Sequence, residues 1–188
     1  DDPVGTVTLP ANGAEVNVAP VEVSGTADDT DPDGAGDRIK GTIDFVEVAI
    51  QQNPPSGNWF NWNSSTWAFT ESVETWKVAV GTSPWTLDTS TVGFVGDFNY
   101  LVRARVNDVA TNNALSADIT FTYDVTSPTT TITFPTPGST EPNPLNISGT
   151  ADDNLTGVAT VELAIQRVGG SWLNGAALLF DSAGPVFH

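Results

Sequence analysis

The sequence contains no cysteine and no methionine, and His188 is its only histidine. The absence of cysteine excludes disulfide bonds, thiolate nucleophiles and cysteine-ligated zinc. With a single histidine, neither a histidine-based catalytic triad nor a zinc hydrolase is expected. Carboxylates are so numerous that no pair stands out as a general acid and base. We therefore expect a protein that is not an enzyme, with no catalytic residue and no organic cofactor.

Basic residues are also scarce. Lys and Arg number 6 against 23 Asp and Glu, which gives a formal net charge of -17 and a pI near 4.1. Such a chain repels the phosphate backbone of nucleic acids and anionic membrane surfaces. Its natural counterparts are cations, metal ions in particular.

Long hydrophobic runs are missing as well. No stretch of about 18 apolar residues occurs, and residues 1–10 have neither the basic region nor the apolar region of a secretion signal. We expect no membrane insertion in this segment, and any export signal or anchor to lie outside it.

The hydrophobic pattern has a period of two and indicates no convincing helix. Apolar and polar residues alternate in 21–27, 42–51, 100–106 and 117–125, which are rich in Val, Ile, Thr and Tyr. Clusters of Pro, Gly, Asn and Asp, which are turn formers, lie between them. This pattern predicts an all-β fold, an antiparallel β-sandwich.

The chain contains an internal repeat of roughly 125 residues. Residues 7–29 return as residues 132–153, and the six letters SGTADD are repeated unchanged. The sequence VEVAIQ at 46–51 is then echoed by VELAIQ at 161–166. Between SGTADD and this second motif, the first copy has nine extra residues, which hold most of an acidic stretch.

The second copy is incomplete, because it has no counterpart of residues 99–124. A sandwich without its last strands exposes an unpaired sheet edge. Either the polypeptide has been cut, or strands of another molecule complete the fold by donor-strand complementation. The sequence thus predicts two domains: residues 1–125, with a long acidic insertion loop at 28–41, and residues 126–188, truncated or strand-complemented.

These motifs resemble a known family. The order TVTLPANG, VSGTADD, VEVAIQ, YLVRARVNDVATN and TFTYDVTSPTTTITFP is similar to that of tandem bacterial immunoglobulin-like repeats of large cell-surface proteins and adhesins. The resemblance implies tandem Greek-key β-sandwiches that form a stalk, spacer or adhesive module outside the cell. It also implies neighbouring repeats as partners, calcium at loops and domain junctions, and no catalysis.

Five aspartates crowd into residues 28–37, and four of them follow the spacing D-x-D-x-D-G-x-x-D of an EF-hand calcium loop. Lys40 occupies the position of the EF-hand glutamate and no helix flanks the loop, so a true EF-hand is excluded. We predict an EF-like calcium loop between two strands, with a plain solvated acidic loop as the alternative. The predicted ligands are Asp29, Asp31, Asp33 and Asp37, with Asp28, Asp44 or a backbone carbonyl in place of the glutamate.

A second candidate cation site lies at the domain junction. Similar repeats hold a cation between consecutive domains with acidic and amide residues at such places. The candidate ligands are Asp108, Asn112, Asn113, Asp124, Asp152 and Asp153. The alternative is that Asp108 and the asparagines form Asx turns at the end of a hairpin.

Five of the six tryptophans lie in residues 57–85. Exposed rings on a sandwich face would stack on sugars, as in carbohydrate-binding modules, with Trp62 and Trp67 as the rings to test. The alternative is packing in the core, which the match between Trp59 and Trp172 favours.

The sequence therefore predicts a calcium-stabilised, non-catalytic module of an extracellular stalk or cell-surface adhesin. Two alternatives stay open. One is a filament or sheath subunit completed by strand exchange between identical subunits. The other is a carbohydrate-binding accessory module of a secreted enzyme, which would bind a surface glycan.

Overall fold

The computed structural model describes residues 2–29, 41–63, 68–141, 146–175 and 179–188. The chain divides into two compact units, Asp1–Thr126 (unit 1) and Ser127–His188 (unit 2). The described residues form strands, turns and loops, and they contain no helix that could span a membrane.

The strands of unit 1 are β1 (Val4–Leu9), β2 (Ala14–Val16), β3 (Glu22–Asp28), β4 (Ile43–Gln52), β5 (Trp59–Phe60), β6 (Phe69–Glu71), β7 (Lys77–Val78), β8 (Val80–Gly81), β9 (Trp85–Asp88), β10 (Phe98–Asp108), β11 (Asn113–Leu115) and β12 (Ile119–Tyr123). Those of unit 2 are β13 (Thr129–Phe134), β14 (Ser148–Asp152), β15 (Trp172–Asn174) and β16 (Leu179–Ser182).

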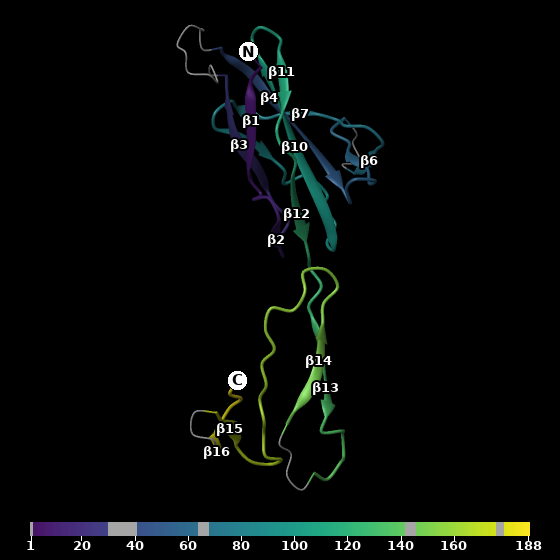
Figure 1. The fold of residues 1–188 in the computed structure, drawn as a ribbon, viewed down its shortest axis with the longest axis vertical. Coiled ribbons are helices and arrows are strands. Elements are labelled where there is room, and N and C mark those ends of the chain that lie inside the picture. The colour runs from purple at the N-terminus through teal and green to yellow at the C-terminus, as the bar shows by residue number, and fades with distance from the viewer. Residues whose placement is uncertain (1, 30–40, 64–67, 142–145, 176–178) are drawn as a thin grey trace. The chain divides into compact units, whose positions relative to one another are not determined.

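Unit 1 is a sandwich of two sheets (Figure 1). One sheet has the order β1-β3-β9-β8, and the other has the order β2-β12-β10-β4-β5-β6, with β11 on β10 and β7 on β4. Neighbouring strands are antiparallel, except that β2 runs parallel to β12. This is the strand arrangement of an immunoglobulin-like Greek-key sandwich. The fold class predicted from the sequence is therefore confirmed.

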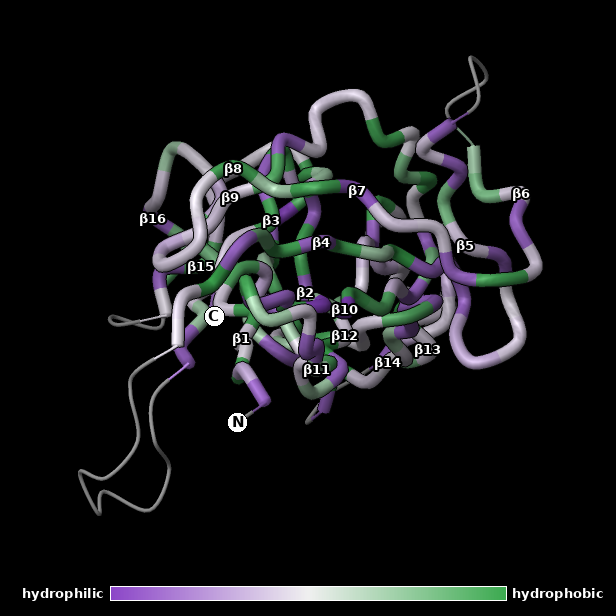
Figure 2. Tube along the Cα trace, turned by 90° about the horizontal axis from the view of Figure 1, so that it is seen from above, coloured by the Kyte–Doolittle hydropathy of each residue, from purple (hydrophilic) through white to green (hydrophobic). Residues whose placement is uncertain are grey.

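Alternation along the strands separates a core face from an outer face. On β10, the side chains of Tyr100, Val102 and Val106 are fully buried, whereas Arg103 and Arg105 lie on the opposite face. Figure 2 shows the same alternation of hydrophobic and hydrophilic residues along β4, the neighbour of β10. Period-two patterning thus places one face of the larger sheet against the other sheet.

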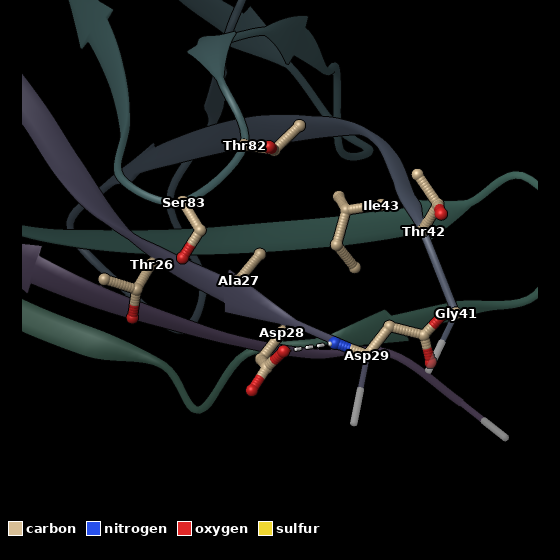
Figure 3. Close-up of a pocket in the computed structure, with 9 residues that line it drawn as sticks. All are labelled: Thr26, Ala27, Asp28, Asp29, Gly41, Thr42, Ile43, Thr82 and Ser83. Carbon is tan, nitrogen blue, oxygen red and sulfur yellow. Dashed lines mark hydrogen bonds between the residues drawn. The ribbon is translucent and has the colours of Figure 1, made fainter. Parts of the chain in front are cut away.

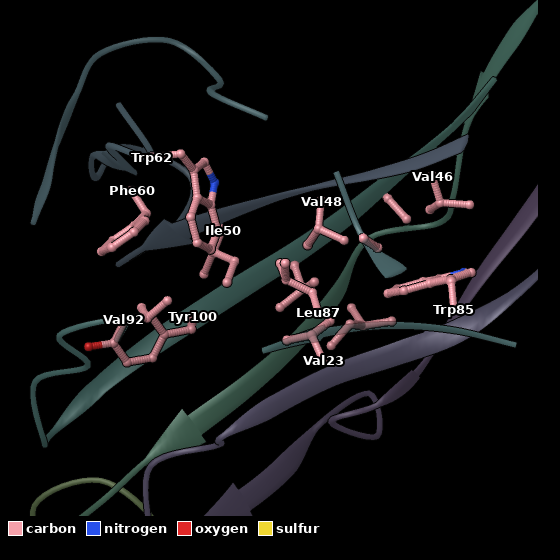
Figure 4. Close-up of a cluster of buried hydrophobic side chains, with 14 of the residues drawn as sticks. Val23, Val46, Val48, Ile50, Phe60, Trp62, Trp85, Leu87, Val92 and Tyr100 are labelled. Atoms are coloured by element: carbon pink, nitrogen blue, oxygen red, sulfur yellow. The ribbon is translucent and has the colours of Figure 1, made fainter. Parts of the chain in front are cut away.

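The core lies between the two sheets (Figure 4). At one end, the fully buried indole of Trp85 lies against Gly25, where a Cβ atom would overlap the ring and the carbonyl oxygen of Thr6. Glycine is therefore required at this position. At the other end, the rings of Tyr100 and Phe121 stack with their centroids 5.2 Å apart.

Two tryptophans cover part of the outer face of the larger sheet. The guanidinium of Arg105 lies 4.3 Å from the ring centroid of Trp76, and that of Arg103 lies 5.7 Å from that of Trp59. Asp118 accepts two hydrogen bonds of 2.6 Å from Arg103 and raises the pKa of that guanidinium. Arginine and aromatic rings together fix the segment around β5 and β7 onto the sheet.

The hydroxyl of Tyr100 is held by three hydrogen bonds. It donates to the Val95 carbonyl oxygen at 2.8 Å and accepts from the Val95 N–H at 2.8 Å and from Gln52 Nε2 at 3.0 Å. Burial raises the pKa of Tyr100, so the hydroxyl is a donor at neutral pH. A tyrosine bonded in this way near the start of this strand is the tyrosine corner of immunoglobulin-like sandwiches.

Unit 2 repeats the first elements of unit 1. The β13–β14 ladder starts at Thr129↔Asp152, as the β1–β3 ladder starts at Val4↔Asp28, and both ladders shift register near their far end. The short pair β15–β16 corresponds to β5–β6, because each begins with the tryptophan shared by the two copies.

The equivalence continues to His188. Leu163 and His188 exchange backbone hydrogen bonds of 2.9 and 3.1 Å, as Val48 of β4 pairs with Lys77 of β7. Residues 161–165, the counterpart of the buried part of β4, nevertheless form no strand. The described residues of unit 2 include no counterpart of β10, the principal partner of β4 in unit 1.

Replacing Tyr100 with phenylalanine should destabilise unit 1 by about 1–3 kcal/mol, because the Val95 N–H and carbonyl groups and Gln52 lose the hydroxyl of this fully buried side chain as their partner. Urea unfolding followed by tryptophan fluorescence measures the change. Tyr123→Phe removes the same hydroxyl from the neighbouring strand and is the matched control. Equal stability of the Tyr100 and Tyr123 variants would contradict a structural role for the corner.

Candidate functional site

The predicted calcium loop begins and ends at a closed neck. The Gly41 N–H, just before β4, donates to the carbonyl oxygen of Asp29, just after β3, at 3.0 Å. The Asp29 N–H donates to the carboxylate of Asp28 at 2.9 Å. Residues 30–40 are therefore inserted at a point where the two strands are already held together.

The carboxylate of Asp29 lies against Gly41, as Figure 3 shows. Asp29 is only 5% exposed, and a Cβ atom on residue 41 would overlap its carboxylate. The glycine thus provides the room that the buried carboxylate needs. Sequence patterning missed this role, because a glycine before a strand indicates only a turn.

A hollow of about 760 Å³ opens beside the neck. Its lining is rich in oxygen-bearing side chains: Thr26, Asp28, Asp29, Thr42, Thr82 and Ser83. Carboxylate, hydroxyl and carbonyl oxygens are hard ligands of the kind that calcium prefers. The neck therefore has the right chemistry for the edge of a calcium site.

The remaining predicted ligands of this loop, Asp31, Asp33 and Asp37, lie outside the described residues. Asp44 is exposed on β4. Within the described part of the chain, no group of three or more His, Asp or Glu is placed to hold a metal ion. The calcium site thus stays a prediction that depends on residues 30–40.

The residues predicted for the second cation site do not come together in unit 1. Asp108 ends β10 opposite Ile43, at the start of β4. Asp124 follows β12, whose Tyr123 pairs with Phe98 at the start of β10. Since β10 is 11 residues long, it spans about 35 Å at roughly 3.3 Å per residue. The prediction that Asp108 and Asp124 share a site is wrong, because β10 and β12 are antiparallel.

Asp108 instead closes the tip of the β10–β11 hairpin. Its Oδ1 accepts the Asn112 N–H at 2.7 Å, and its Oδ2 accepts Asn112 Nδ2 at 2.7 Å. Thr111, within this turn, has a φ of 72°. Asn113, the other candidate amide, lies in β11 and pairs with Asn107. This geometry matches the alternative interpretation, in which these residues shape a turn.

In unit 2, Asp152 is the last residue of β14 and Asp153 closes the next turn. Oδ2 of Asp153 accepts the N–H groups of Leu155, Thr156 and Gly157 at 3.3, 3.1 and 3.1 Å. The counterpart of Asp153 in unit 1 is Asp29. The same aspartate of the repeat therefore closes a tight turn in unit 2 and lies at the neck of a longer loop in unit 1.

Asp97 is a structural residue that sequence reasoning missed. Its Oδ1 accepts the N–H groups of Val125 and Thr126 at 2.9 and 3.2 Å, and its Oδ2 accepts the Thr126 hydroxyl at 2.7 Å. The preceding Gly96 has no room for a Cβ atom beside Val125. The chain is therefore fixed to the sandwich up to the last residue of unit 1.

The tryptophans that the structure describes in unit 1 pack against protein. Trp62 is 7% exposed and contacts Phe60 edge to face, with centroids 4.6 Å apart. Trp59 and Trp85 are buried too, whereas Trp67 lies outside the described residues. A ring buried like that of Trp62 cannot present its face to a sugar.

Residues 128–185 match the family model of a bacterial Ig domain, which confirms the resemblance to bacterial immunoglobulin-like repeats. The matched residues lie in unit 2. Domains of this family are generally non-catalytic, are typically extracellular or surface-exposed, and indicate a structural or adhesive module. No curated protein matches the chain.

Gly41→Ala should destabilise unit 1 by about 1–3 kcal/mol, since the added methyl group must displace the buried Asp29 carboxylate. Adding Asp29→Ala should recover part of this loss, because it removes the group that the methyl overlaps. Denaturant unfolding of the single and double variants measures the coupling. Gly184→Ala, at a position with open space around it, is the control. Additive effects of the two changes would contradict the packing of Asp29 against Gly41.

Proposed function

We propose that the chain is a non-catalytic structural module of an extracellular stalk or cell-surface adhesin, stabilised by calcium bound in the loop between β3 and β4. The observation that carries the structural role is the attachment of Val125 and Thr126 to Asp97, at the point where one repeat ends. A stalk transmits force through such chain ends, and a fixed exit keeps the connection short and stiff.

The surroundings of the charged groups support a role without catalysis. Asp118 and Glu74 bind Arg103, and Glu47 binds Arg105 at 2.7 Å, so these carboxylates are engaged in ion pairs on the outer face of the sheet. Asp108 accepts its hydrogen bonds from a turn. Each of these carboxylates is engaged in an ion pair or in a turn. Calcium binding by the loop between β3 and β4 is therefore the function that we propose to test.

The calcium proposal is supported by charge and by the closed neck. Asp31, Asp33 and Asp37 have the ligand spacing of an EF-hand loop and follow directly on the carboxylates of Asp28 and Asp29. Carboxylates crowded in this way repel one another, and a bound divalent cation relieves the repulsion. Because the hydrogen bond between Gly41 and Asp29 already holds the loop ends together, an ion would not have to bring them together itself.

Calcium should raise the thermal midpoint of the chain relative to a chelator. At free calcium of about 100 times its dissociation constant, the stabilisation is about 2.7 kcal/mol, or several degrees in the midpoint. Calorimetry of the full chain measures the shift, which a variant with Asp31→Asn, Asp33→Asn and Asp37→Asn should lose.

The matched control is a variant with Glu15→Gln, Glu22→Gln and Glu141→Gln, which removes the same number of charges away from the loop. It should keep the calcium shift. If the native chain shows no shift, or if both triple variants lose it equally, calcium does not bind in this loop.

Asp97→Ala should free the end of unit 1 without unfolding it. The Val125 amide loses its acceptor, so its hydrogen exchange should become at least about tenfold faster. Amide exchange followed by NMR measures this, with Asp88→Ala as the control, because Asp88 accepts its hydrogen bond from the nearby Ser90. Unchanged protection of Val125 would contradict a tethering role for Asp97.

A further inference from the structure

The carboxylate of Asp29 is buried without a hydrogen-bond partner. Asp29 is 5% exposed, and its side-chain oxygens accept no hydrogen bond within the part of the chain that the structure describes. Its counterpart in unit 2, Asp153, accepts three backbone N–H groups at 3.1 to 3.3 Å. Burying an ionised carboxylate that has neither hydrogen bonds nor an opposite charge is costly. A group that compensates the charge of Asp29 is therefore expected beside it.

The hollow beside the neck offers oxygen atoms and no basic side chain. Among the described residues that line it, none is Lys or Arg. Thr42, Thr82 and Ser83 line it too, and their hydroxyls form no hydrogen bond within the described residues. Figure 3 shows these residues around the hollow together with Asp28 and Asp29. Two carboxylates and several neutral oxygens suit a hydrated divalent cation, which completes its shell with water.

Segments of both sheets of unit 1 meet at this hollow. Asp29 follows β3, and Ser83 lies between β8 and β9, which are all strands of the four-stranded sheet. Thr42 directly precedes β4 of the other sheet. The hydrogen bond from the Gly41 N–H to the Asp29 carbonyl oxygen already joins the two sheets at the neck. A cation in the hollow adds a second connection at the same end of unit 1.

We infer that Asp29 anchors a divalent cation in this hollow, and that the cation clamps the two sheets together at the neck. This inference rests on the calcium proposal above and extends it, because it places one anchor of the ion on the sandwich itself. Asp29 supplies a desolvated charge, for which the cation is the missing counter-charge. The hydroxyls of Thr42 and Ser83 supply neutral oxygens, which bind the ion directly or through its water.

Asp29→Asn tests the inference, because its effect on stability should change sign with calcium. The amide has nearly the shape of the carboxylate and carries no charge. In a chelator, the variant should unfold at a higher temperature than the native chain, since an uncompensated buried charge is removed. In saturating calcium it should unfold at a lower temperature, since the ion loses its anchor. Calorimetry of the full chain in the two buffers measures both midpoints.

Asp44→Asn is the matched control. It removes the same charge from an exposed position on β4 and should leave both midpoints nearly unchanged. Two further variants, Thr42→Val and Ser83→Ala, remove hydroxyls that line the hollow. They should lower the midpoint in calcium and leave it nearly unchanged in the chelator.

A lower midpoint of Asp29→Asn in both buffers would assign the counter-charge to a group of the chain and would overturn the inference. A variant that keeps the full calcium shift of the native chain would overturn it as well, while the calcium proposal would stand. If Asp29→Asn does not fold, full calcium shifts in both hydroxyl variants overturn the inference. Absence of a calcium shift in the native chain is a different result, because it would overturn the calcium proposal itself and the inference with it.

Discussion

The pairing of β4 with β10 is the contact on which unit 1 depends. Nine residue pairs join these strands, from Tyr100↔Gln52 to Asp108↔Ile43. On the core face the ladder buries Val48 and Val102, and on the outer face it supports Trp59, Trp76 and the arginines that stack on them. In the described residues of unit 2, which hold no counterpart of β10, residues 161–165 resemble the sequence of β4 but form no strand. A strand-like sequence becomes a strand only when its neighbour is present.

The same ladders decide which residues can act together. Because β10 and β12 are antiparallel, Asp108 shares an end of unit 1 with the neck at Gly41, whereas Asp124 and Asp97 lie at the end where the chain leaves the unit. Residues close in sequence are thereby separated by the length of a strand. The acidic insertion and the linker attachment occupy opposite ends, so either can change without disturbing the other.

Period-two alternation predicted β3, β4, β10 and β12, because each of these strands has one face in the core. The repeated SGTADD predicted that β14 is built like β3, and the identical registers agree with this. What the sequence could not predict depends on contacts between distant segments. The role of Tyr100 depends on its contact with Val95, that of Asp97 on its contact with Val125, and that of Gly41 on the carboxylate of Asp29 packed against it. The hydrophobic period of a strand does not predict contacts of this kind.

The two predicted metal sites differ in the same respect, because one takes its ligands from a single loop and the other from both ends of a strand. Spacing within a single loop is visible in a sequence, so the ligand pattern of residues 29–37 could be recognised. Convergence of residues from both ends of a strand is not visible, and the grouping of Asp108 with Asp124 failed for that reason. Sequence spacing can therefore suggest a metal site only where one turn supplies most of the ligands, and the site at residues 29–37 stays a prediction.

The neck explains how the first copy accommodates nine more residues than the second. Doubling the length of a flexible loop costs only about 0.6 kcal/mol in closure entropy, and the bond between Gly41 and Asp29 fixes the distance that must be closed. In the second copy, Asp153 uses its carboxylate to accept backbone N–H groups. In the first copy, Asp29 lies buried at the base of the insertion. A repeat can thus gain an acidic loop at one end while its sheets keep the register on which the fold depends.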